Sequence, residues 1–183
     1  MSWSRIARRI RVPLGFVLAA LFLWLAQPTV LSLVIGGLVA LLGVGVRAAA
    51  SGYIAKNEQV TSTGPYAATR NPLYLGSIVL AAGLAVAARS WWIVLAMAIL
   101  FAAIYLPVIR SEEAYLRAKF SEYDDYARRV PRLLPTFSSA RTALRTAGAF
   151  SRERYLRHRE YNALIGTAAL IAALAVKMAW MAR

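Results

Sequence analysis

A polar segment with unusual backbone and charge properties lies between two long apolar runs. It covers residues 64–76 and reads Gly-Pro-Tyr-Ala-Ala-Thr-Arg-Asn-Pro-Leu-Tyr-Leu-Gly. Its two prolines fix backbone angles and lack N–H donors, and its two glycines permit turns or close backbone approach. Arg70 stands at the edge of the next apolar run, where an unpaired guanidinium is costly. The natural partners are Glu112 and Glu113, which follow the next two apolar runs.

A second polar segment follows these glutamates and combines apolar, aromatic and proline residues. Its apolar side chains recur at steps of three and four residues: Leu116, Phe120, Tyr123, Ala127 and Val130. This period predicts an amphipathic helix over residues 111–130, which we expect to lie on the cytoplasmic face of a membrane. Pro131 and the stretch Leu133-Leu134-Pro135 then end the helix.

Taken in order, these motifs resemble the isoprenylcysteine carboxyl methyltransferase and phospholipid methyltransferase superfamily. The resemblance rests on Gly64-Pro65-Tyr66, the run from Arg70 to Gly76, the two glutamates, the aromatic spacing and the final prolines. It covers residues 47–135, about half of the chain. Many members of the superfamily carry His where this chain has Asn71, so no imidazole chemistry is expected there.

The resemblance implies a methyltransferase that uses S-adenosylmethionine and releases S-adenosylhomocysteine. The sequence has no Gly-x-Gly-x-x-Gly motif after a strand, so a Rossmann cofactor site is not expected. Helix ends and loops would instead hold the cofactor in a cytoplasmic cap. Carboxylates suit its amino group or ribose diol, arginine suits its carboxylate, and aromatic or proline surfaces suit its adenine and sulfonium.

On this interpretation, Arg70 and Glu112 are the candidate catalytic residues. Arg70 would orient an acceptor carboxylate or phosphate beside the methyl group, and catalysis would consist mainly of in-line positioning. A carboxylate acceptor needs no base, whereas an amine would require Glu112 or Glu113 to accept its proton. The candidate cofactor-binding residues are Asn71, Pro72, Tyr74, Gly76, Glu112, Glu113, Tyr123, Tyr126, Val130, Pro131 and Leu134.

Several of these residues also have a purely structural interpretation. Glu113 and Arg117 are spaced as an i,i+4 ion pair on a hydrated helix surface. The tyrosines could be interfacial aromatic residues, and the prolines could simply shape the backbone. Arg47 either approaches the cofactor, as the resemblance suggests, or only ends a helix on the cytoplasmic side.

The composition predicts one integral membrane domain covering residues 1–183. Hydrophobic residues make up 60% of the chain and gather in long runs. We expect an all-α polytopic fold with about five transmembrane helices, over 12–27, 29–46, 73–88, 91–109 and 161–182, and cytoplasmic motif segments over 47–72 and 110–160. Glycines in the second span would let helices approach closely, within one chain or between two copies.

The basic residues are distributed unevenly over this topology. With a cytoplasmic N-terminus, all but three of the 22 Lys and Arg residues lie on the cytoplasmic side; the exceptions are Arg89, Lys177 and Arg183. The net charge of +14 therefore indicates topology and contact with anionic membrane lipids, and no nucleic-acid partner is expected. A bacterial inner membrane is the expected location.

Metal and thiol chemistry is not expected. The chain has no cysteine and a single histidine, His158, within a basic run. A lone imidazole of this kind does not predict a metal site.

The expected function is methyl transfer to a lipophilic acceptor, such as a prenylcysteine-type carboxylate or a phosphatidylethanolamine-type amine. One alternative is a membrane reductase that uses a nicotinamide dinucleotide, although such proteins usually have more spans. Another is a lipid-binding scaffold without catalysis, which explains the arginines but not the ordered motif. Binding of S-adenosylhomocysteine, of a dinucleotide, or of neither distinguishes the three.

Overall fold

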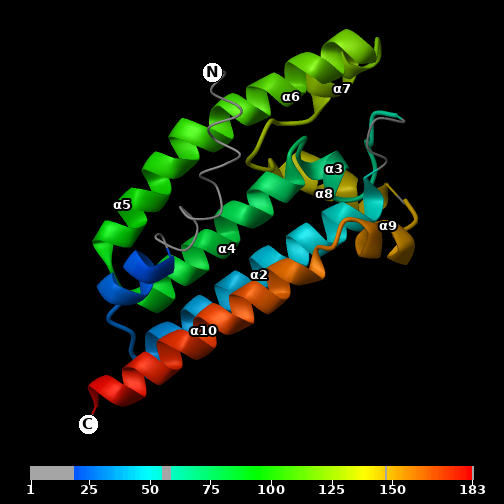
Figure 1. Cartoon of the computed structure of the whole chain (residues 1–183). Helices are drawn as coiled ribbons and strands as arrows, with labels where there is room; N and C mark the ends of the chain where they lie inside the picture. Colours follow the sequence, from blue (N-terminus) through cyan, green and yellow to red (C-terminus); the bar gives the residue numbers. More distant parts are fainter. Residues whose placement is uncertain (1–18, 55–58, 147, 183) are drawn as a thin grey trace.

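The computed structural model describes residues 19–54, 59–146 and 148–182, and the secondary structure in these ranges is helical, without strands. This confirms the predicted all-α fold. The long helices run side by side, with the short helices gathered at one end (Figure 1). We call this the motif end, because residues 64–76 and the two glutamates lie there.

Three helices are long and apolar enough to cross a membrane. They are α2 (Val30–Tyr53), a continuous helix over Trp91–Lys119 and α10 (Tyr161–Met181). A fourth apolar helix, α4 (Pro72–Ala88), is shorter at 17 residues. Of the predicted first span, residues 19–25 are helical and residues 12–18 lie outside the described residues. Five spans therefore stays a prediction, whereas the membrane character of the chain is supported.

The helix over Trp91–Lys119 is not uniform. It consists of α5 (Trp91–Leu100), a π-helical segment η1 (Phe101–Tyr105) and α6 (Leu106–Lys119). Pro107 is the second residue after η1 and has no N–H to donate to the preceding turn, which accounts for the local change in hydrogen bonding. Because a π-helical turn holds more residues than an α-helical turn, the side chains of α6 point in other directions than they would in an uninterrupted α-helix.

Four short helices form the cap at the motif end: α3 (Pro65–Ala68), α7 (Tyr123–Arg129), α8 (Phe137–Arg145) and α9 (Arg152–Arg157). The prediction of one amphipathic helix over residues 111–130 is wrong in this respect. α6 ends at Lys119, Phe120 is extended, and a new helix begins at Tyr123. Asp124 and Asp125 in the first turn of α7 favour this new start, because carboxylates stabilise helix N-termini.

α2 and α4 touch backbone to backbone through glycines. A Cβ added to Gly43 would lie 2.3 Å from the Leu80 backbone nitrogen, and one added to Gly83 would lie 2.3 Å from the Ala40 nitrogen. Only residues without a side chain permit this approach, as is usual at transmembrane helix interfaces. The contact fixes where α4 begins, and so where residues 70–76 lie.

At the opposite end of the bundle, α10 is connected to the helix at 19–25. The Lys177 ammonium donates to the carbonyl oxygens of Leu23 (2.6 Å), Trp24 (2.9 Å) and Ala26 (2.6 Å). These carbonyls lie at the helix end and lack helical partners, so a cation there stabilises the end.

We predict that Gly43→Ala destabilises the protein, because the new methyl group meets backbone atoms that cannot rotate away. Such overpacking costs about 1–3 kcal/mol of unfolding free energy. Gly45→Ala is the matched control on the same helix, since its Cβ would meet nothing within 4 Å. Thermal unfolding in detergent should show a lower Tm for Gly43→Ala only. Equal Tm values would contradict the close contact.

Candidate functional site

The site begins where two segments far apart in sequence are joined through their backbones. The Arg70 N–H donates to the Pro131 carbonyl oxygen at 2.9 Å. The Asn71 side-chain amide donates to the Arg132 carbonyl oxygen at 2.8 Å, and the Thr69 hydroxyl donates to the same oxygen at 3.2 Å. The segment before α4 and the segment after α7 therefore form one unit.

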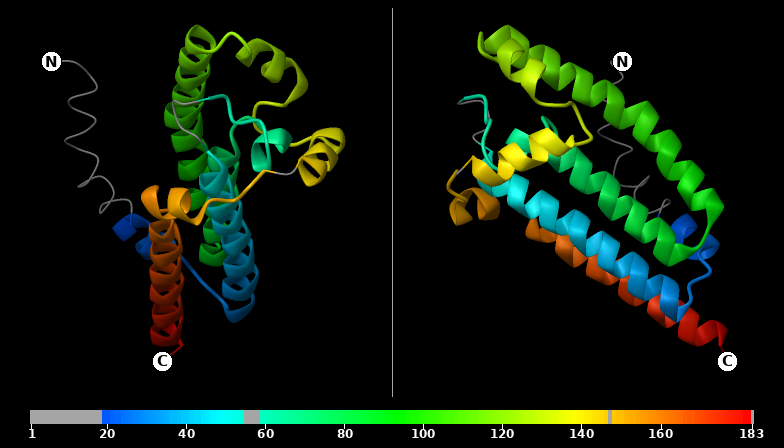
Figure 2. Two further views of the ribbon diagram at one scale, coloured as in Figure 1. Left: turned by 90° about the vertical axis from the view of Figure 1, so that its right-hand side faces the viewer. Right: turned by 180° about the vertical axis from the view of Figure 1, so that it is seen from behind.

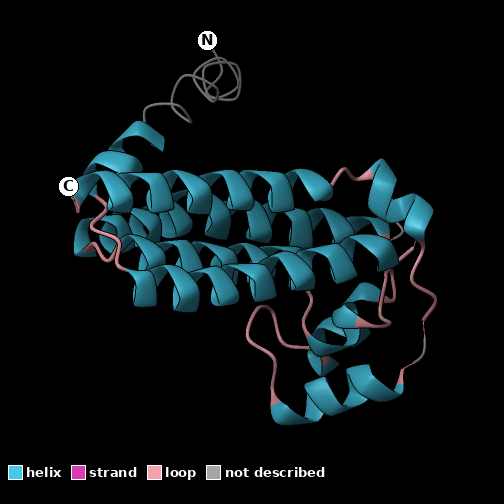
Figure 3. Ribbon diagram, turned by 90° about the horizontal axis from the view of Figure 1, so that it is seen from below, coloured by secondary structure: helices cyan, strands magenta, loops and turns pink. Residues whose placement is uncertain are grey.

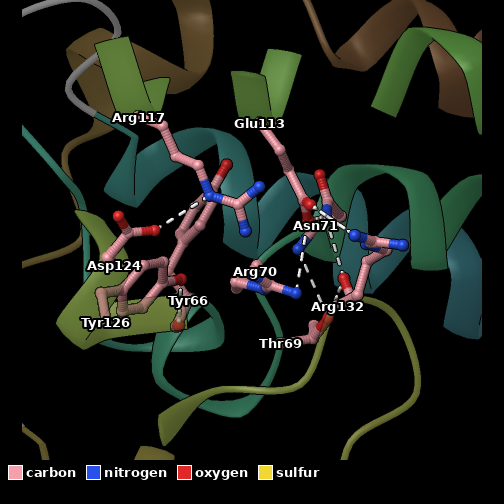
Figure 4. Close-up of polar contacts among 9 residues, drawn as sticks. All are labelled: Tyr66, Thr69, Arg70, Asn71, Glu113, Arg117, Asp124, Tyr126 and Arg132. Atoms are coloured by element: carbon pink, nitrogen blue, oxygen red, sulfur yellow. Dashed lines mark hydrogen bonds and ion pairs between the residues drawn. The ribbon is translucent and has the colours of Figure 1, made fainter. Parts of the chain in front are cut away.

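Glu113 of α6 lies at the centre of this unit, as Figure 4 shows. Its side chain is 3% exposed. One carboxylate oxygen accepts from Arg132 Nε at 3.0 Å, and the other accepts from the Asn71 amide at 3.3 Å and lies 3.6 Å from Arg70 Nη2. Both oxygens are thus engaged, with two guanidiniums offsetting the cost of burying the charge.

This geometry confirms one expectation and corrects another. Arg70 pairs with one of the two predicted glutamates, Glu113. Arg117, the predicted i,i+4 partner of Glu113, instead donates to Asp124 at 2.9 Å and lies over the Tyr123 ring. Glu113 points inward, whereas Arg117 lies on the exposed side of α6.

The tyrosines of α7 form the packed interior of the cap. Tyr123 is 2% exposed, its ring meets that of Tyr126 edge to face at 5.9 Å, and the Tyr126 hydroxyl donates to the Tyr66 carbonyl oxygen at 2.7 Å. Burial raises the pKa of both hydroxyl groups, so they remain protonated at neutral pH. These residues hold α7 against α3.

Two buried polar atoms near this interior have no hydrogen-bond partner among the described residues. They are Arg70 Nε and the Tyr66 hydroxyl oxygen. Burial, and then Tyr126, Glu112 and Glu160, raise the pKa of Tyr66, so its hydroxyl remains a donor. Unpaired buried donors are rare in native proteins and call for an explanation, such as a bound molecule.

Glu112 differs from its neighbour in position and in partners. It is exposed, and no ion pair to it is found within the described ranges. Its carboxylate lies close enough to the Tyr74 hydroxyl on the first turn of α4 for the two groups to interact electrostatically. Glu112 is therefore the carboxylate of the pair that remains available to a ligand.

A second polar cluster forms around Arg47, in the C-terminal part of α2. The guanidinium donates to both carboxylate oxygens of Glu160 at 3.0 Å, to the Leu73 carbonyl oxygen at 3.4 Å and to the Ser77 hydroxyl. Arg47 thus connects α2, α4 and the start of α10, and does more than end a helix.

The other predicted residues occupy different kinds of position. Gly76 allows close packing, because a Cβ there would lie 2.6 Å from Arg47 Cγ. Pro72 is buried at the first turn of α4, and Val130 and Pro131 are half-buried. Leu134 is 72% exposed and lies on the surface of the cap.

An apolar cavity of about 410 Å³ lies between α4 and the α5–η1 part of the long helix. Ser77 and Tyr105 supply the hydroxyl groups among its lining residues. Ser77 accepts from Arg47, and the Tyr105 ring meets that of Tyr74 edge to face at 5.7 Å. The cavity therefore extends from the motif end along the apolar surfaces of the helices. Another cavity, of about 440 Å³, is lined by Trp24, Arg89 and Trp91 and lies at the opposite end.

Comparison with known proteins identifies the family of the chain. The profile of the phospholipid methyltransferase family matches residues 11–123. The chain belongs to this family. Membership supports methyltransferase activity on a lipid-type substrate and, together with the apolar helices, a membrane location.

Two curated relatives are similar to part of the chain. The nickel-cobalt-cadmium resistance protein NccN of Alcaligenes xylosoxydans xylosoxydans is 40% identical over 100 residues, which cover 53% of this chain and 47% of that protein. The cobalt-zinc-cadmium resistance protein CzcN of Cupriavidus metallidurans is 36% identical over 83 residues, covering 45% of this chain and 38% of that protein. The match thus spans less than half of each relative. No solved structure matches significantly.

Four residues of the site were not predicted: Tyr66 as an unpaired donor, Thr69, Arg132 and Glu160. Glu160 could have been suspected, because an acidic residue directly before an apolar span needs a cation. Arg132 carried no such signal, since it is one of many arginines in the cap. Among the described residues, no group of three or more His, Cys, Asp or Glu could hold a metal ion.

We predict that Glu113→Gln strongly destabilises the protein, because it leaves two guanidiniums beside a neutral amide. Removing one partner of a buried pair costs about 3 kcal/mol or more of unfolding free energy. The control is Glu153→Gln, whose exposed pair with Arg157 should contribute less than about 1 kcal/mol. Thermal unfolding in detergent measures both, and similar Tm losses for the two variants would refute the central role of Glu113.

Proposed function

We propose that this protein transfers the methyl group of S-adenosylmethionine to a lipid acceptor at the motif end of the bundle. The observation that carries the proposal is the apolar cavity between α4 and α5–η1. Its lining includes Ser77, which accepts from Arg47, and Tyr105, whose ring meets that of Tyr74. An acyl chain suits such a cavity, and its headgroup would then lie beside the polar residues.

The residues at the motif end fit the cofactor. It supplies an electrophilic methyl group on a sulfonium, together with a carboxylate, an amino group, a ribose diol and an adenine. The unpaired Arg70 Nε and Tyr66 hydroxyl are donors for carboxylate or ribose oxygens. The exposed Glu112 carboxylate suits the amino group or the diol.

The two glutamates take different roles in this proposal. Glu113 already accepts hydrogen bonds from Arg132 and Asn71 and forms an ion pair with Arg70, so it orients Arg70 and Asn71 for the ligand. Glu112 faces the ligand directly. Tyr123 and Tyr126 were predicted to bind the cofactor; in this proposal they instead position Tyr66 and Arg70.

An amine headgroup of the phosphatidylethanolamine type is the acceptor that the family favours. The neutral amine nitrogen uses its lone pair to form the new N–CH₃ bond, and the sulfonium leaves as a neutral thioether. The ammonium form has no lone pair, so a base must first remove a proton, and Glu112 is placed for this. Arg47, whose partner Ser77 lines the cavity, would hold the lipid phosphate.

We place the motif end on the cytoplasmic side of a bacterial inner membrane. The basic residues of α6 to α9 lie at this end, and the cofactor is a cytoplasmic metabolite. At the other end, the charge of Lys177 is satisfied by three carbonyl groups. This distribution agrees with the excess of Lys and Arg in cytoplasmic segments of membrane proteins.

The names of the two relatives refer to metal resistance, and the site suggests how this chain would contribute to such a process. Metal-ligand clusters are not found in the part of the chain that the structure describes. We therefore infer that any such contribution comes through the lipid product, because a fully methylated amine has no lone pair to bind a metal.

The test uses membranes that contain the protein and methyl-labelled S-adenosylmethionine, with the label counted in extracted lipid. We expect label in the lipid of wild-type membranes and a loss of about 100-fold or more in Glu112→Gln, as is usual for loss of a catalytic base. Glu122→Gln, an exposed change at the residue before α7, should leave the rate unchanged.

Calorimetry with S-adenosylhomocysteine separates the possible outcomes. Binding of S-adenosylhomocysteine without transfer of label would support the proposed cofactor site and would show that the tested lipids are not the acceptor. A wild-type protein that neither binds this ligand nor transfers label would contradict the proposal, and a dinucleotide would then be titrated to test the reductase alternative.

A further inference from the structure

Helix α8 carries two large apolar side chains that are almost fully exposed. Phe137 is 88% exposed and Leu144 is 91% exposed. They are seven residues apart, so they lie two turns apart along the same edge of the helix. Exposed apolar side chains arranged in this way indicate a surface that is covered by a membrane or by another molecule.

The remaining positions of α8 form distinct stripes. Arg141 and Arg145 lie one turn apart beside the apolar edge, whereas Ser139 is buried against the cap. The sequence has no Asp or Glu from residue 130 to residue 152, so no acidic side chain of this segment offsets the two arginines. An apolar edge flanked by arginines is typical of helices that lie in a membrane interface.

The position of α8 in the fold agrees with this pattern. α8 lies beside the helical bundle at the motif end, and its axis runs across those of α2 and α10 (Figure 2). Seen from below, part of the cap is displaced to one side of the bundle (Figure 3). A bilayer that surrounds the long helices would thus have its surface at the level of α8.

We propose that α8 lies in the headgroup region of the leaflet at the motif end, with Phe137 and Leu144 inserted and Arg141 and Arg145 on anionic lipid phosphates. The occupant of this surface is the membrane itself. The arginines supply the charge complementarity, because anionic leaflets attract basic residues close to their surface. This inference is independent of the methyl-transfer reaction.

The contact with the membrane is connected directly to the site. The Ser139 hydroxyl donates to the Ala68 carbonyl oxygen at 2.8 Å, which joins α8 to the end of α3. Ala68 is followed at once by Thr69, Arg70 and Asn71, the residues that surround Glu113. Through α8, the membrane surface is therefore connected to the segment that contains the ligand donors Tyr66 and Arg70.

The absence of cysteine from the sequence permits a direct test. Phe137→Cys and Leu144→Cys place a single environment-sensitive fluorophore on the apolar edge, and Thr142→Cys places it on the far side of the same helix. Each labelled protein is reconstituted in nanodiscs containing phosphatidylglycerol. Quenching is measured with spin-labelled acyl chains and, separately, with aqueous iodide.

We expect the probes at 137 and 144 to be quenched several-fold more by the spin-labelled lipid than the probe at 142, and several-fold less by iodide. Equal iodide quenching at all three positions would overturn the proposal. Protection from iodide without lipid quenching would also overturn it, because protein, such as a second copy of the chain, would then cover the edge.

The charge dependence is tested with Arg141→Gln and Arg145→Gln, and with Arg128→Gln on α7 as the control. Each α8 substitution should lower the quenching of the probes at 137 and 144 by spin-labelled lipid about fivefold. The reason is that a basic residue near an anionic surface contributes about 1 kcal/mol to membrane binding. The contact should also weaken with salt. Equal lipid quenching in neutral and anionic nanodiscs would refute the anionic part of the proposal.

Discussion

The architecture of this site depends on one buried carboxylate. Glu113 is nearly inaccessible to solvent, so its charge must be compensated by protein groups. Those groups come from two segments that are otherwise separate, the turn before α4 with Arg70 and Asn71, and the segment after α7 with Arg132. One ionic cluster therefore determines how the long helix α6, the start of α4 and the cap meet.

The membrane part of the fold supplies the frame for this cluster. α2 and α4 are in backbone contact through glycines, which fixes the start of α4 and brings Arg47 to Ser77. The helix made of α5, η1 and α6 is held less closely to α4, and an apolar cavity lies between them. A rigid helix pair beside an apolar cavity suits a protein that must hold polar ligand groups precisely and admit a lipid from the side.

The sequence allowed prediction of those features that depend on local patterns. Long apolar runs predicted membrane helices, and the cost of a guanidinium at a membrane edge predicted that Arg70 pairs with one of two glutamates. It could not decide between Glu112 and Glu113, because the π-helical segment before Pro107 changes the rotation of α6 relative to the preceding span. Arg132 and Glu160 depend on long-range packing, so no local pattern marked them. The break at Phe120 was also missed, because the apolar period continues across it while the backbone turns.

Hydrogen–deuterium exchange of Glu113→Gln in detergent tests the central role of this carboxylate most directly. If Glu113 joins the two segments, the Arg70 amide, which donates to the Pro131 carbonyl, should exchange much faster in the variant, together with its neighbours in residues 69–71. The middle of α2 should keep its wild-type protection, since its contact with α4 does not involve Glu113. Unchanged exchange in residues 69–71, or faster exchange confined to α6, would contradict this account.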